Sequence, residues 1–329
     1  MPTPLKSGEV LKNRYKIRQI IGQGGMGSIY LADDLRLEGR SCALKEVEHD
    51  RTMATDVLKQ TREQFFREAT VLARLDHPNL PKVSDFFSLS GRDYLVMDFV
   101  PGKDLRMLMV EAHNKGKFLS EREVLGWASQ LADALTYMHS QNPPILHRDI
   151  KPSNLKLTPS GLLKLVDFGL VKILALDEVT ITILQGRGTA LYTPLEQYGG
   201  DTGHTDGRSD IYAFGATLYH LLTSTRPVEA RELFLNPDLL PPPRQINPDI
   251  SLRTERAILW AMKLHPEERP QNVEEFRQAL LGDWNPVTRP RAPLPTPSVV
   301  DVVASPTEMA LIWVSAGLVL ISLILTLSQ

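Results

Sequence analysis

The chain of 329 residues carries a formal net charge of −2 and 42% hydrophobic residues, which is typical of a folded protein with one large or two smaller domains. No cluster of Lys and Arg stands out, so the sequence gives no reason to expect a nucleic-acid partner, whose phosphates select concentrated positive charge. The single cysteine, Cys42, excludes an internal disulfide and favours a reducing compartment.

The N-terminal part of the chain alternates short strand-like segments with one helical segment. Its first ten residues lack the apolar core of a secretory signal, so we do not expect export. β-branched and aromatic residues predict strands at YKIRQII (15–21), SIYLA (28–32), SCALKEV (41–47) and DYLVMDF (93–99). Residues 119–283 show helical periodicity instead. This division predicts a small sheet-rich lobe followed by a larger helical lobe.

A glycine-rich segment, IGQGGMGSIY, joins the first two predicted strands. Without Cβ atoms, Gly22, Gly24 and Gly27 allow backbone N–H groups to approach phosphate oxygens closely. A glycine-rich hairpin turn without a ligand would have the same composition, and dinucleotide-binding loops share the G-x-G-x-x-G spacing. A dinucleotide loop opens a helix, however, whereas the strand-like SIYLA follows here, so we disfavour that class.

Lys45 lies in the third predicted strand among apolar neighbours. Its ammonium faces either a cleft or water, and most single lysines on strands face water. Glu68 lies 23 residues later on the predicted helix, with Phe65 at i−3 and Leu72 at i+4, so it is placed beside the apolar stripe. A carboxylate on a packing face needs a partner, and Lys45 is the candidate.

The segments HRDIKPSN (147–154) and DFG (167–169) place two carboxylates, an amide and an ammonium in a short stretch. These groups are Asp149, Asp167, Asn154 and Lys151. Each aspartate alone could simply stabilise a turn. Pro152 and Asn154 mark a loop, and the apolar strand LLKLVDF lies about a dozen residues away, so a hairpin-like unit would bring the groups to one pocket. Together they suit phosphoryl transfer, which needs metal ligands, a carboxylate for the acceptor hydroxyl and a nearby cation.

Two distinct segments follow the helical region. Residues 285–307 contain six prolines and neither glycine nor an aromatic residue, which predicts an extended tether. From Met309 to Gln329 no residue is charged, and the apolar run of about 20 residues would span roughly 30 Å as a helix, enough to cross a bilayer. Trp313 suits the membrane interface. A buried core helix is the alternative, but such helices usually carry a polar stripe.

These motifs, in their order and spacing, resemble those of the bacterial eukaryotic-like Ser/Thr protein kinases. The resemblance covers about residues 13–283 and implies an α+β, bilobal protein-kinase fold with a small antiparallel β-sheet N-lobe, one main helix and a larger helical C-lobe. The implied organisation is an N-terminal extension (1–12), an N-lobe (about 13–98), a C-lobe (about 101–283), a Pro-rich linker (284–308) and a transmembrane helix (309–328).

The resemblance also implies the reaction and the residues that carry it. The γ-phosphoryl group of ATP would pass to Ser or Thr hydroxyls of proteins, with Mg²⁺ or Mn²⁺ as the metal. Asp149 would orient the acceptor hydroxyl, Lys151 would neutralise the γ-phosphoryl group, and Asn154 and Asp167 would bind the metal. A lysine two residues after the catalytic aspartate favours Ser/Thr over Tyr specificity.

The nucleotide site is implied in the same way. The glycine loop would cover the phosphates, Lys45 would hold them while paired with Glu68, and Met97 would be the gatekeeper. Backbone groups of Asp98 and Val100 would bond adenine, and Asp104 would lie near the ribose. The predicted nucleotide-binding residues are Ile21, Gly22, Gln23, Gly24, Gly25, Met26, Gly27, Ser28, Ile29, Ala43, Lys45, Glu68, Met97, Asp98, Val100 and Asp104.

The segment GTALYTPLE (188–196) resembles the end of an activation segment. There Thr189 would contact Asp149 and Lys151, Glu196 would pair with Arg269, and Asp210 would brace the catalytic loop. PLE stands where the family has APE. Lys156 occupies a position beneath adenine that is normally apolar. We expect its stem to lie under the base and its ammonium to reach water, with altered nucleotide affinity as the result.

Regulation and location complete the expectations. Arg148 would pair with a phosphorylated residue, and we expect one or both of Thr180 and Thr182 to be autophosphorylated in trans within a transient homodimer on the membrane. The same threonines also suit a packed β-like stretch. Because ATP is cytosolic, a single-pass membrane anchor would leave the kinase domain in the cytoplasm. A nucleotide-binding pseudokinase would show a degraded motif, and a small-molecule phosphotransferase would lack GTALYTPLE, so both are disfavoured.

Overall fold

The computed structural model describes residues 4–24, 27–47, 55–167, 172–173, 190–198 and 205–282. The chain forms two compact units, Met1–Asn285 and Pro286–Gln329, and the second lies entirely outside the described residues. The linker (284–308) and the membrane helix (309–328) therefore stay predictions. Across the ranges given above, no helix combines the length and the apolar composition needed to cross a bilayer.

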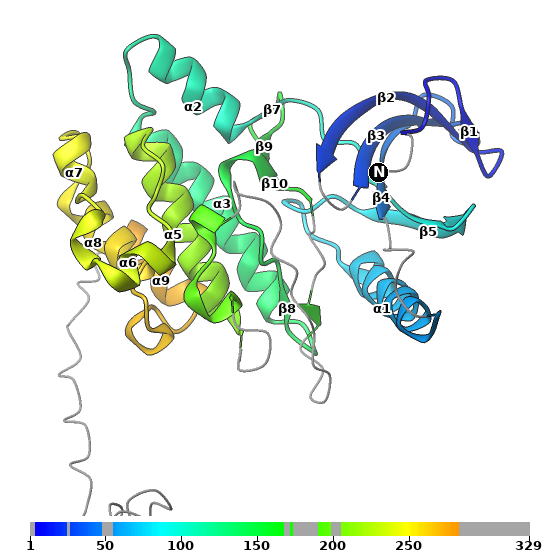
Figure 1. The fold of residues 1–329 in the computed structure, drawn as a ribbon. Helices are drawn as coiled ribbons and strands as arrows, with labels where there is room; N and C mark the ends of the chain where they lie inside the picture. The colour runs from blue at the N-terminus through cyan, green and yellow to red at the C-terminus, as the bar shows by residue number, and fades with distance from the viewer. Residues whose placement is uncertain are drawn as a thin grey trace, which may run out of the picture. The chain divides into compact units, whose positions relative to one another are not determined.

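The N-terminal lobe is built on a six-stranded antiparallel sheet in the order β1-β2-β3-β4-β6-β5 (Figure 1). The strands are β1 (Val10–Leu11), β2 (Tyr15–Gly24), β3 (Gly27–Asp34), β4 (Ser41–Val47), β5 (Val83–Leu89) and β6 (Arg92–Asp98). The four strands predicted from β-branched and aromatic content are confirmed as β2, β3, β4 and β6. β5 was missed because polar residues interrupt its apolar pattern.

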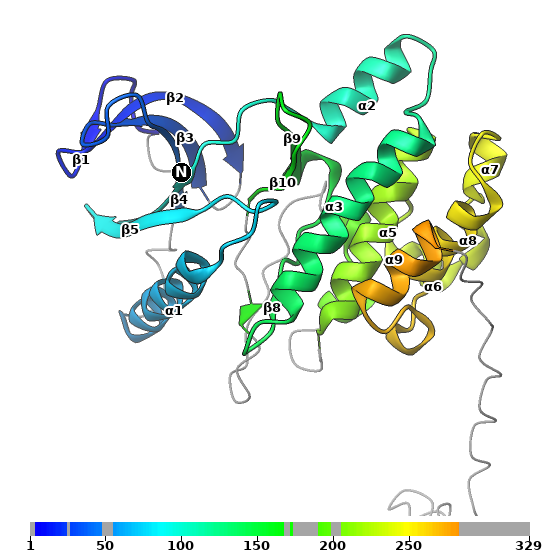
Figure 2. The same ribbon diagram turned by 180° about the vertical axis from the view of Figure 1, so that it is seen from behind.

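One long helix, α1 (Thr55–Arg74), lies beside this sheet, next to β5, in both ribbon views (Figures 1 and 2). Its buried side chains recur with helical spacing: Phe65, Ala69 and Leu72 all join the main hydrophobic core. Glu68 is buried on the same helix at 7% exposure. The predicted position of Glu68 beside the apolar stripe is therefore confirmed.

The C-terminal lobe is helical and centres on α5. Its helices are α2 (Leu105–Asn114), α3 (Glu121–His139), α5 (Gly207–Thr223), α6 (Ala230–Leu235), α7 (Pro243–Ile246), α8 (Leu252–Ala261) and α9 (Val273–Leu281). Every residue of α5 from Ser209 to Thr223 is buried, as expected for a helix surrounded by others. A Cβ at Gly215 would lie 2.7 Å from Cβ of Ala261, so glycine allows α5 and α8 to pack closely.

Short strands and 3-10 turns connect the larger elements of both lobes. One small sheet has the order β10-β9-β7, and a second joins β8 to β11. Their bounds are β7 (Lys103–Asp104), β8 (Ile145–Leu146), β9 (Leu155–Leu157), β10 (Leu163–Leu165) and β11 (Lys172–Ile173). The 3-10 turns are η1 (Pro152–Asn154), η2 (Ala190–Tyr192), η3 (Leu195–Gln197), η4 (Pro237–Leu239) and η5 (Pro266–Glu268). The β9–β10 hairpin is the unit predicted to place the catalytic loop beside the DFG strand end.

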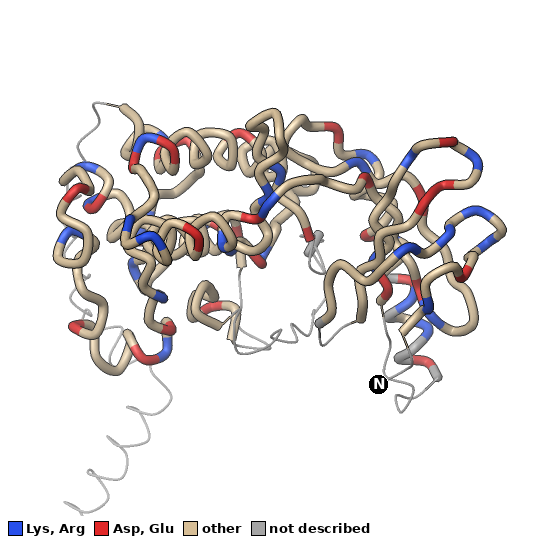
Figure 3. Tube along the Cα trace, turned by 90° about the horizontal axis from the view of Figure 1, so that it is seen from above, with Lys and Arg blue, Asp and Glu red and all other residues tan. Residues whose placement is uncertain are grey.

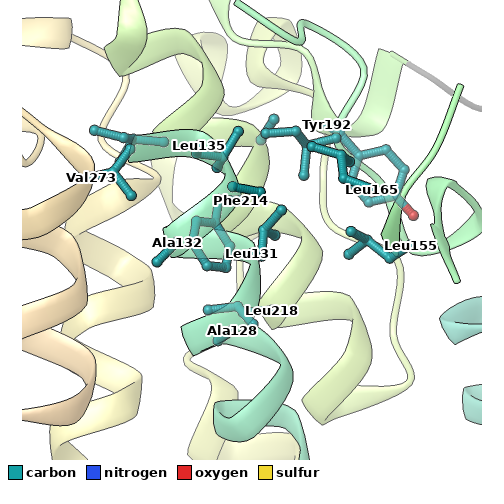
Figure 4. Packing of buried hydrophobic residues seen from close by; sticks show 14 of the residues in the cluster. Ala128, Leu131, Ala132, Leu135, Leu155, Leu165, Tyr192, Phe214, Leu218 and Val273 are labelled. Carbon is teal, nitrogen blue, oxygen red and sulfur yellow. The ribbon is translucent and has the colours of Figure 1, made fainter. Parts of the chain in front are cut away.

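Two hydrophobic clusters hold the described fold together. The larger joins α1 and the sheet residues Ala43, Leu95 and Met97 to the helices of the C-terminal lobe. Figure 4 shows its centre, where Leu131 and Leu135 of α3 face Phe214 of α5. The smaller cluster belongs to the N-terminal sheet and is rich in tyrosine. Charged residues of both signs are interspersed along the trace of both lobes (Figure 3).

Candidate active site

The catalytic loop brings three of the four predicted catalytic residues into direct contact. Asp149 is buried, and Nζ of Lys151 lies 2.9 and 2.8 Å from its two carboxylate oxygens. Nδ2 of Asn154 donates to the backbone oxygen of Asp149 at 2.8 Å and to its Oδ2 at 2.9 Å. Pro152 starts the 3-10 turn η1 that carries Asn154 back to Asp149. Because the amide N–H groups of Asn154 face Asp149, its Oδ1 is left to bind a ligand.

Asp167, the fourth catalytic residue, lies just beyond the end of β10. The N–H of Val166 donates to the carbonyl of Asn154 at 2.8 Å, which fixes this strand end beside the catalytic loop. Asp167 has a φ of 59°, the left-handed region that few residues other than glycine occupy. Strain of this kind is concentrated at functional sites. Phe168 and Gly169 lie outside the described residues.

Lys45 reaches Asp167 across the space between the lobes. Its Nζ lies 2.5 Å from Oδ1 of Asp167. Burial would raise the pKa of Asp167, but the charge and the hydrogen bond of Lys45, with Lys151 and His147, lower the pKa below its ordinary value. Asp167 is therefore a carboxylate at neutral pH.

The pairing of Lys45 with Glu68 stays a prediction. Both side chains make further interactions, so neither is without a partner. Glu68 interacts electrostatically with Arg148. Burial lowers the pKa of the Arg148 guanidinium, and the negative charges of Asp210 and Glu68 act in the opposite direction. Glu68 therefore lies within electrostatic range of the catalytic loop.

Asp210 supports the catalytic loop from α5 and is fully buried. Its two carboxylate oxygens accept hydrogen bonds from the backbone N–H of His147 at 2.9 Å and of Arg148 at 2.8 Å. Nε2 of His139 lies 2.8 Å from Oδ2 of Asp210. Burial would raise the pKa of Asp210, but the contacts with His139 and His147 lower it overall.

These contacts confirm the predicted brace and explain a strained residue. Arg148 has a φ of 64°, a left-handed conformation that costs about 1–2 kcal/mol outside glycine. Asp210 holds the N–H of Arg148 in this conformation. The side chain of Arg148 contacts the hydroxyl of Thr205 through Nη2.

The glycine loop is a hairpin tip between β2 and β3. Gly22, Gln23 and Gly24 pair with Ile29, Ser28 and Gly27 in antiparallel register. A strand follows the glycines rather than a helix, which excludes the dinucleotide-binding alternative. Gly27 has a φ of 136°, and a Cβ there would lie 2.2 Å from the carbonyl oxygen of Glu46. Ile21 lies in β2, and Gly25 and Met26 lie outside the described residues.

The segment joining the lobes begins at the end of β6. Met97 and Ala43 are both buried and pair across β6 and β4. The N–H of Asp98 donates to the carbonyl of Lys82 at 2.9 Å, whereas no backbone hydrogen bond within the described ranges uses the N–H of Val100. Asp104 stabilises the start of α2, accepting from the N–H of Met107 at 2.8 Å.

Lys156 departs from the expectation that its ammonium reaches water. Its Nζ donates to the carbonyl oxygen of Val100 at 2.7 Å and lies 5.4 Å from the ring centroid of Phe99. The side chain is half-buried, and burial lowers the pKa of its amine while Asp104 acts in the opposite direction. The expectation was wrong because β9 pairs with β7, directly opposite Asp104, and so brings the amine within reach of the connecting segment.

The predicted pair of Glu196 and Arg269 is confirmed. The guanidinium Nη1 and Nη2 atoms lie 2.6 and 3.0 Å from the two carboxylate oxygens. Arg269 is 1% exposed and also donates to the carbonyls of Lys263, Leu264 and Arg208. This network anchors η3, which follows Pro194, to the helical lobe. Thr180, Thr182 and Thr189 lie outside the described residues.

Two contacts near the site were not foreseen from the sequence. His139 bonds to Asp210 from 71 residues away, and the hydroxyl of Tyr192 lies 2.6 Å from Nδ1 of His220. Burial lowers the pKa of His220 to about 4, so this histidine is neutral and can accept the tyrosine hydroxyl. No local signal marks such pairs, because tertiary packing brings them together, α3 against α5 in the first pair and η2 against α5 in the second.

The lobes, the glycine hairpin and the catalytic loop define a protein kinase fold. The chain belongs to the protein kinase family, because the family model for the protein kinase domain matches residues 15–280. A solved structure of the kinase domain of PknI from Mycobacterium tuberculosis matches with a TM-score of 0.66 and 30% identity. That match covers 84% of this chain and 98% of the solved one.

Curated relatives agree with this assignment. A probable serine/threonine-protein kinase of Clostridium acetobutylicum is 36% identical over 284 residues, which is 84% of this chain and 41% of the relative. The serine/threonine-protein kinase PknB of Mycobacterium leprae is 33% identical over 282 residues, covering 82% of this chain and 43% of the relative. The chain thus spans about two fifths of the length of these relatives.

Proposed function

We propose that this protein is an ATP-dependent serine/threonine protein kinase. The observation that carries the proposal is the contact set of Asp149, Lys151 and Asn154, which lies beside Asp167 at the end of the neighbouring strand. Family membership and the names of the relatives support the same activity.

Asp149 would orient the acceptor hydroxyl and take its proton. Its carboxylate is held by Lys151 and Asn154, so it is preorganised before a substrate arrives. Lys151 is then placed to offset negative charge on the phosphoryl group as it moves towards the hydroxyl. A Ser or Thr side chain of a protein is the acceptor that this arrangement would serve.

The residues present fit a divalent metal. Oδ1 of Asn154 and the carboxylate of Asp167 are hard oxygen ligands of the type that Mg²⁺ prefers, and Mn²⁺ accepts the same set. When bound, the metal would neutralise charge on the nucleotide phosphates. Lys45, now 2.5 Å from Asp167, would pair with those phosphates, and the hairpin of Gly22, Gly24 and Gly27 would cover them.

We infer adenine recognition at the segment between the lobes. The N–H of Val100, which no backbone hydrogen bond within the described ranges uses, and the carbonyl of Asp98 would bond the base, near the buried side chains of Ala43 and Met97. Asp104, at the start of α2, would lie near the ribose.

The decisive experiment compares phosphate transfer by the parent and by Asp149→Asn. Purified protein, Mg²⁺, ATP labelled at the γ position and a generic protein substrate suffice. We expect Asp149→Asn to lose activity by about 10²- to 10⁴-fold, the usual contribution of a general base. Asp133→Asn is the matched control, because Asp133 is about half-exposed and pairs with Arg277 on the surface.

Two outcomes would contradict the proposal. Equal transfer by Asp149→Asn and the parent would remove Asp149 from the reaction. A parent that binds ATP but transfers nothing would favour the pseudokinase alternative.

We further propose autophosphorylation in trans at Thr180 or Thr182, within a transient homodimer. The support is the position of both threonines in the segment that follows DFG and the presence of Arg148 before Asp149. Mass spectrometry should find a phosphate on at least one of them in the parent and on neither in Asp149→Asn. Active protein with both threonines unmodified would contradict this.

We also propose a single-pass membrane anchor at 309–328, with the kinase domain in the cytoplasm. The support is the uncharged apolar run and its preceding proline-rich linker. The parent should stay in the membrane fraction after an alkaline wash, and Leu318→Arg should release it, because a central charge opposes insertion. A parent found wholly in the soluble fraction would contradict the anchor.

A further inference from the structure

We propose that Lys156 selects the nucleobase: its ammonium, bonded to the carbonyl of Val100, rejects purines that carry a 2-amino group and so favours adenine. This inference rests on the proposed function, since it concerns the base of the same nucleotide. It assigns a specificity role to a residue that stands where the family has an apolar side chain.

The position of the amine is set by several contacts. Nζ of Lys156 lies 2.7 Å from the carbonyl oxygen of Val100 and 5.4 Å from the ring centroid of Phe99. β9 holds the backbone of Lys156 opposite Asp104 in β7. Val100 itself is 6% exposed, and its hydrogen bond with the amine is partly buried. The amine is therefore fixed at one end of the edge that would contact the base.

The position of the amine matters because purines differ in the group that they carry at C2. If the 6-amino group of adenine donates to the carbonyl of Asp98 and N1 accepts from the N–H of Val100, the next ring atom, C2, faces the carbonyl of Val100. Adenine has only a C–H there, which forms at most a weak hydrogen bond and loses little when no acceptor is available. Guanine and 2,6-diaminopurine have a 2-amino group, which is a donor that requires an acceptor.

Lys156 competes for that acceptor, because its hydrogen bond occupies one of the two lone pairs of the Val100 carbonyl and places an ammonium beside the other. A lysine ammonium has three donors and no acceptor, so a 2-amino group would meet positive charge and a carbonyl that is already bonded. A 2-amino group at this shared acceptor would make a weaker hydrogen bond and recover less of its lost hydration, and repulsion by the ammonium would add to the cost. An apolar side chain at position 156, by contrast, would leave the carbonyl of Val100 open to the 2-amino group.

A neighbouring lysine provides a matched control. Lys164 pairs directly with Lys156 across β9 and β10, and its Nζ donates to the carbonyl of Leu80 at 3.0 Å. It is also half-buried, and burial lowers the pKa of its amine. Lys164→Met therefore removes the same kind of hydrogen bond without touching the carbonyl of Val100.

The test compares kcat/KM for ATP and for 2-amino-ATP in the full chain. We expect the parent and Lys164→Met to prefer ATP by about tenfold, in line with one poorly satisfied donor. Lys156→Met should use the two nucleotides about equally or prefer 2-amino-ATP. Lys156→Gln, which keeps a donor for Val100 and adds an acceptor, should also lose the preference and guards against misfolding of the methionine variant.

A binding measurement separates this inference from the proposed function. Thermal stabilisation by adenosine and by 2-aminoadenosine reports base selection without catalysis. A change of preference in the Lys156 variants, with no phosphate transfer by the parent, would uphold the inference and overturn the kinase activity. Transfer by the parent with an unchanged preference in both Lys156 variants would overturn the inference alone, as would a parent that uses ATP and 2-amino-ATP equally.

Discussion

Buried charges in the two lobes are used differently. In the N-terminal lobe, Asp34 accepts two hydrogen bonds from Arg14, at 2.9 and 2.8 Å, and Glu46 contacts Tyr30 and Arg92. These side-chain pairs link β3 to the turn before β2 and to the neighbouring strands, and the backbone N–H that donates to Asp34, from Arg36 at 3.1 Å, lies far from the catalytic loop in the chain. In the C-terminal lobe, Asp210 instead accepts from the backbone of the catalytic loop.

Substitutions of the two kinds of buried charge should therefore have different effects, one on stability and the other on catalysis. Removing a charge that joins two strands loosens the sheet but leaves the catalytic loop in place. Removing a charge that holds the backbone of His147 and Arg148 releases the residues next to Asp149, whose position decides the rate. Arg269 also holds backbone, because it donates to the carbonyls of Lys263, Leu264 and Arg208 as well as to Glu196, but none of these lies in the catalytic loop, so its loss should reduce stability.

The largest loss of stability is expected from Arg269→Met. Glu196 would then keep a partly buried charge without its partner, and three carbonyls would lose a donor, so the free energy of unfolding should fall by about 3–5 kcal/mol. Arg277→Met is the control, because Arg277 is 37% exposed and pairs with Asp133 and Glu274 on the surface. Its cost should stay below about 1 kcal/mol. Urea unfolding measures the free energy of unfolding of both variants, and equal losses would contradict the larger contribution of the buried arginine.

A smaller effect depends on pH and belongs to His220. The pKa of this buried histidine is lowered from 6.5 to about 4. Between these values the unfolded chain binds a proton that the folded chain does not, so stability falls as the pH drops from about 6.5 to about 4, by at most about 3 kcal/mol. Burial also lowers the pKa of His147, which acts with the same sign.

His220→Gln isolates this contribution. The glutamine keeps an acceptor for the hydroxyl of Tyr192 and does not titrate, so stability should depend less on pH between 6.5 and 4 than in the parent. Below that range the carboxylates with lowered pKa values, Asp34 and Asp210, lose their own contribution in both proteins. Identical pH profiles above pH 4 would contradict the assignment.

The smallest effect is expected in the N-terminal lobe. The hydroxyl of Tyr30 donates to Oε2 of Glu46 at 2.7 Å and accepts from the N–H of Leu5 at 3.1 Å. Tyr30→Phe should cost about 1 kcal/mol, because Arg92 still neutralises Glu46. Turnover per folded molecule should not change. A tenfold loss of turnover would mean that this network reaches the catalytic site.

Much of the fold and of the site could be predicted from the sequence. The strands β2, β3, β4 and β6 carry enough β-branched and aromatic residues to be recognised, and the motif residues of the catalytic loop lie close together in the chain. Asp210 and the pair of Glu196 and Arg269 came from the family resemblance, because nothing local in the sequence points to them.

The remaining features depend on tertiary structure. The contact of His139 with Asp210 arises only when α3 and α5 pack. The amine of Lys156 donates to the carbonyl of Val100, whose position is set by the connection between the lobes. The general rule that a long lysine side chain extends to water failed there, because a buried acceptor lay within reach.

The central claim is that buried charge in the C-terminal lobe positions the catalytic loop. Turnover per folded molecule in Asp210→Asn and Asp34→Asn tests it most directly. Both substitutions remove one buried charge and should cost similar stability. We predict that Asp34→Asn keeps turnover within about twofold of the parent, whereas Asp210→Asn loses about 10²-fold, the cost of a displacement of about 1 Å. Equal turnover in the two variants, measured where both are fully folded, would contradict the claim.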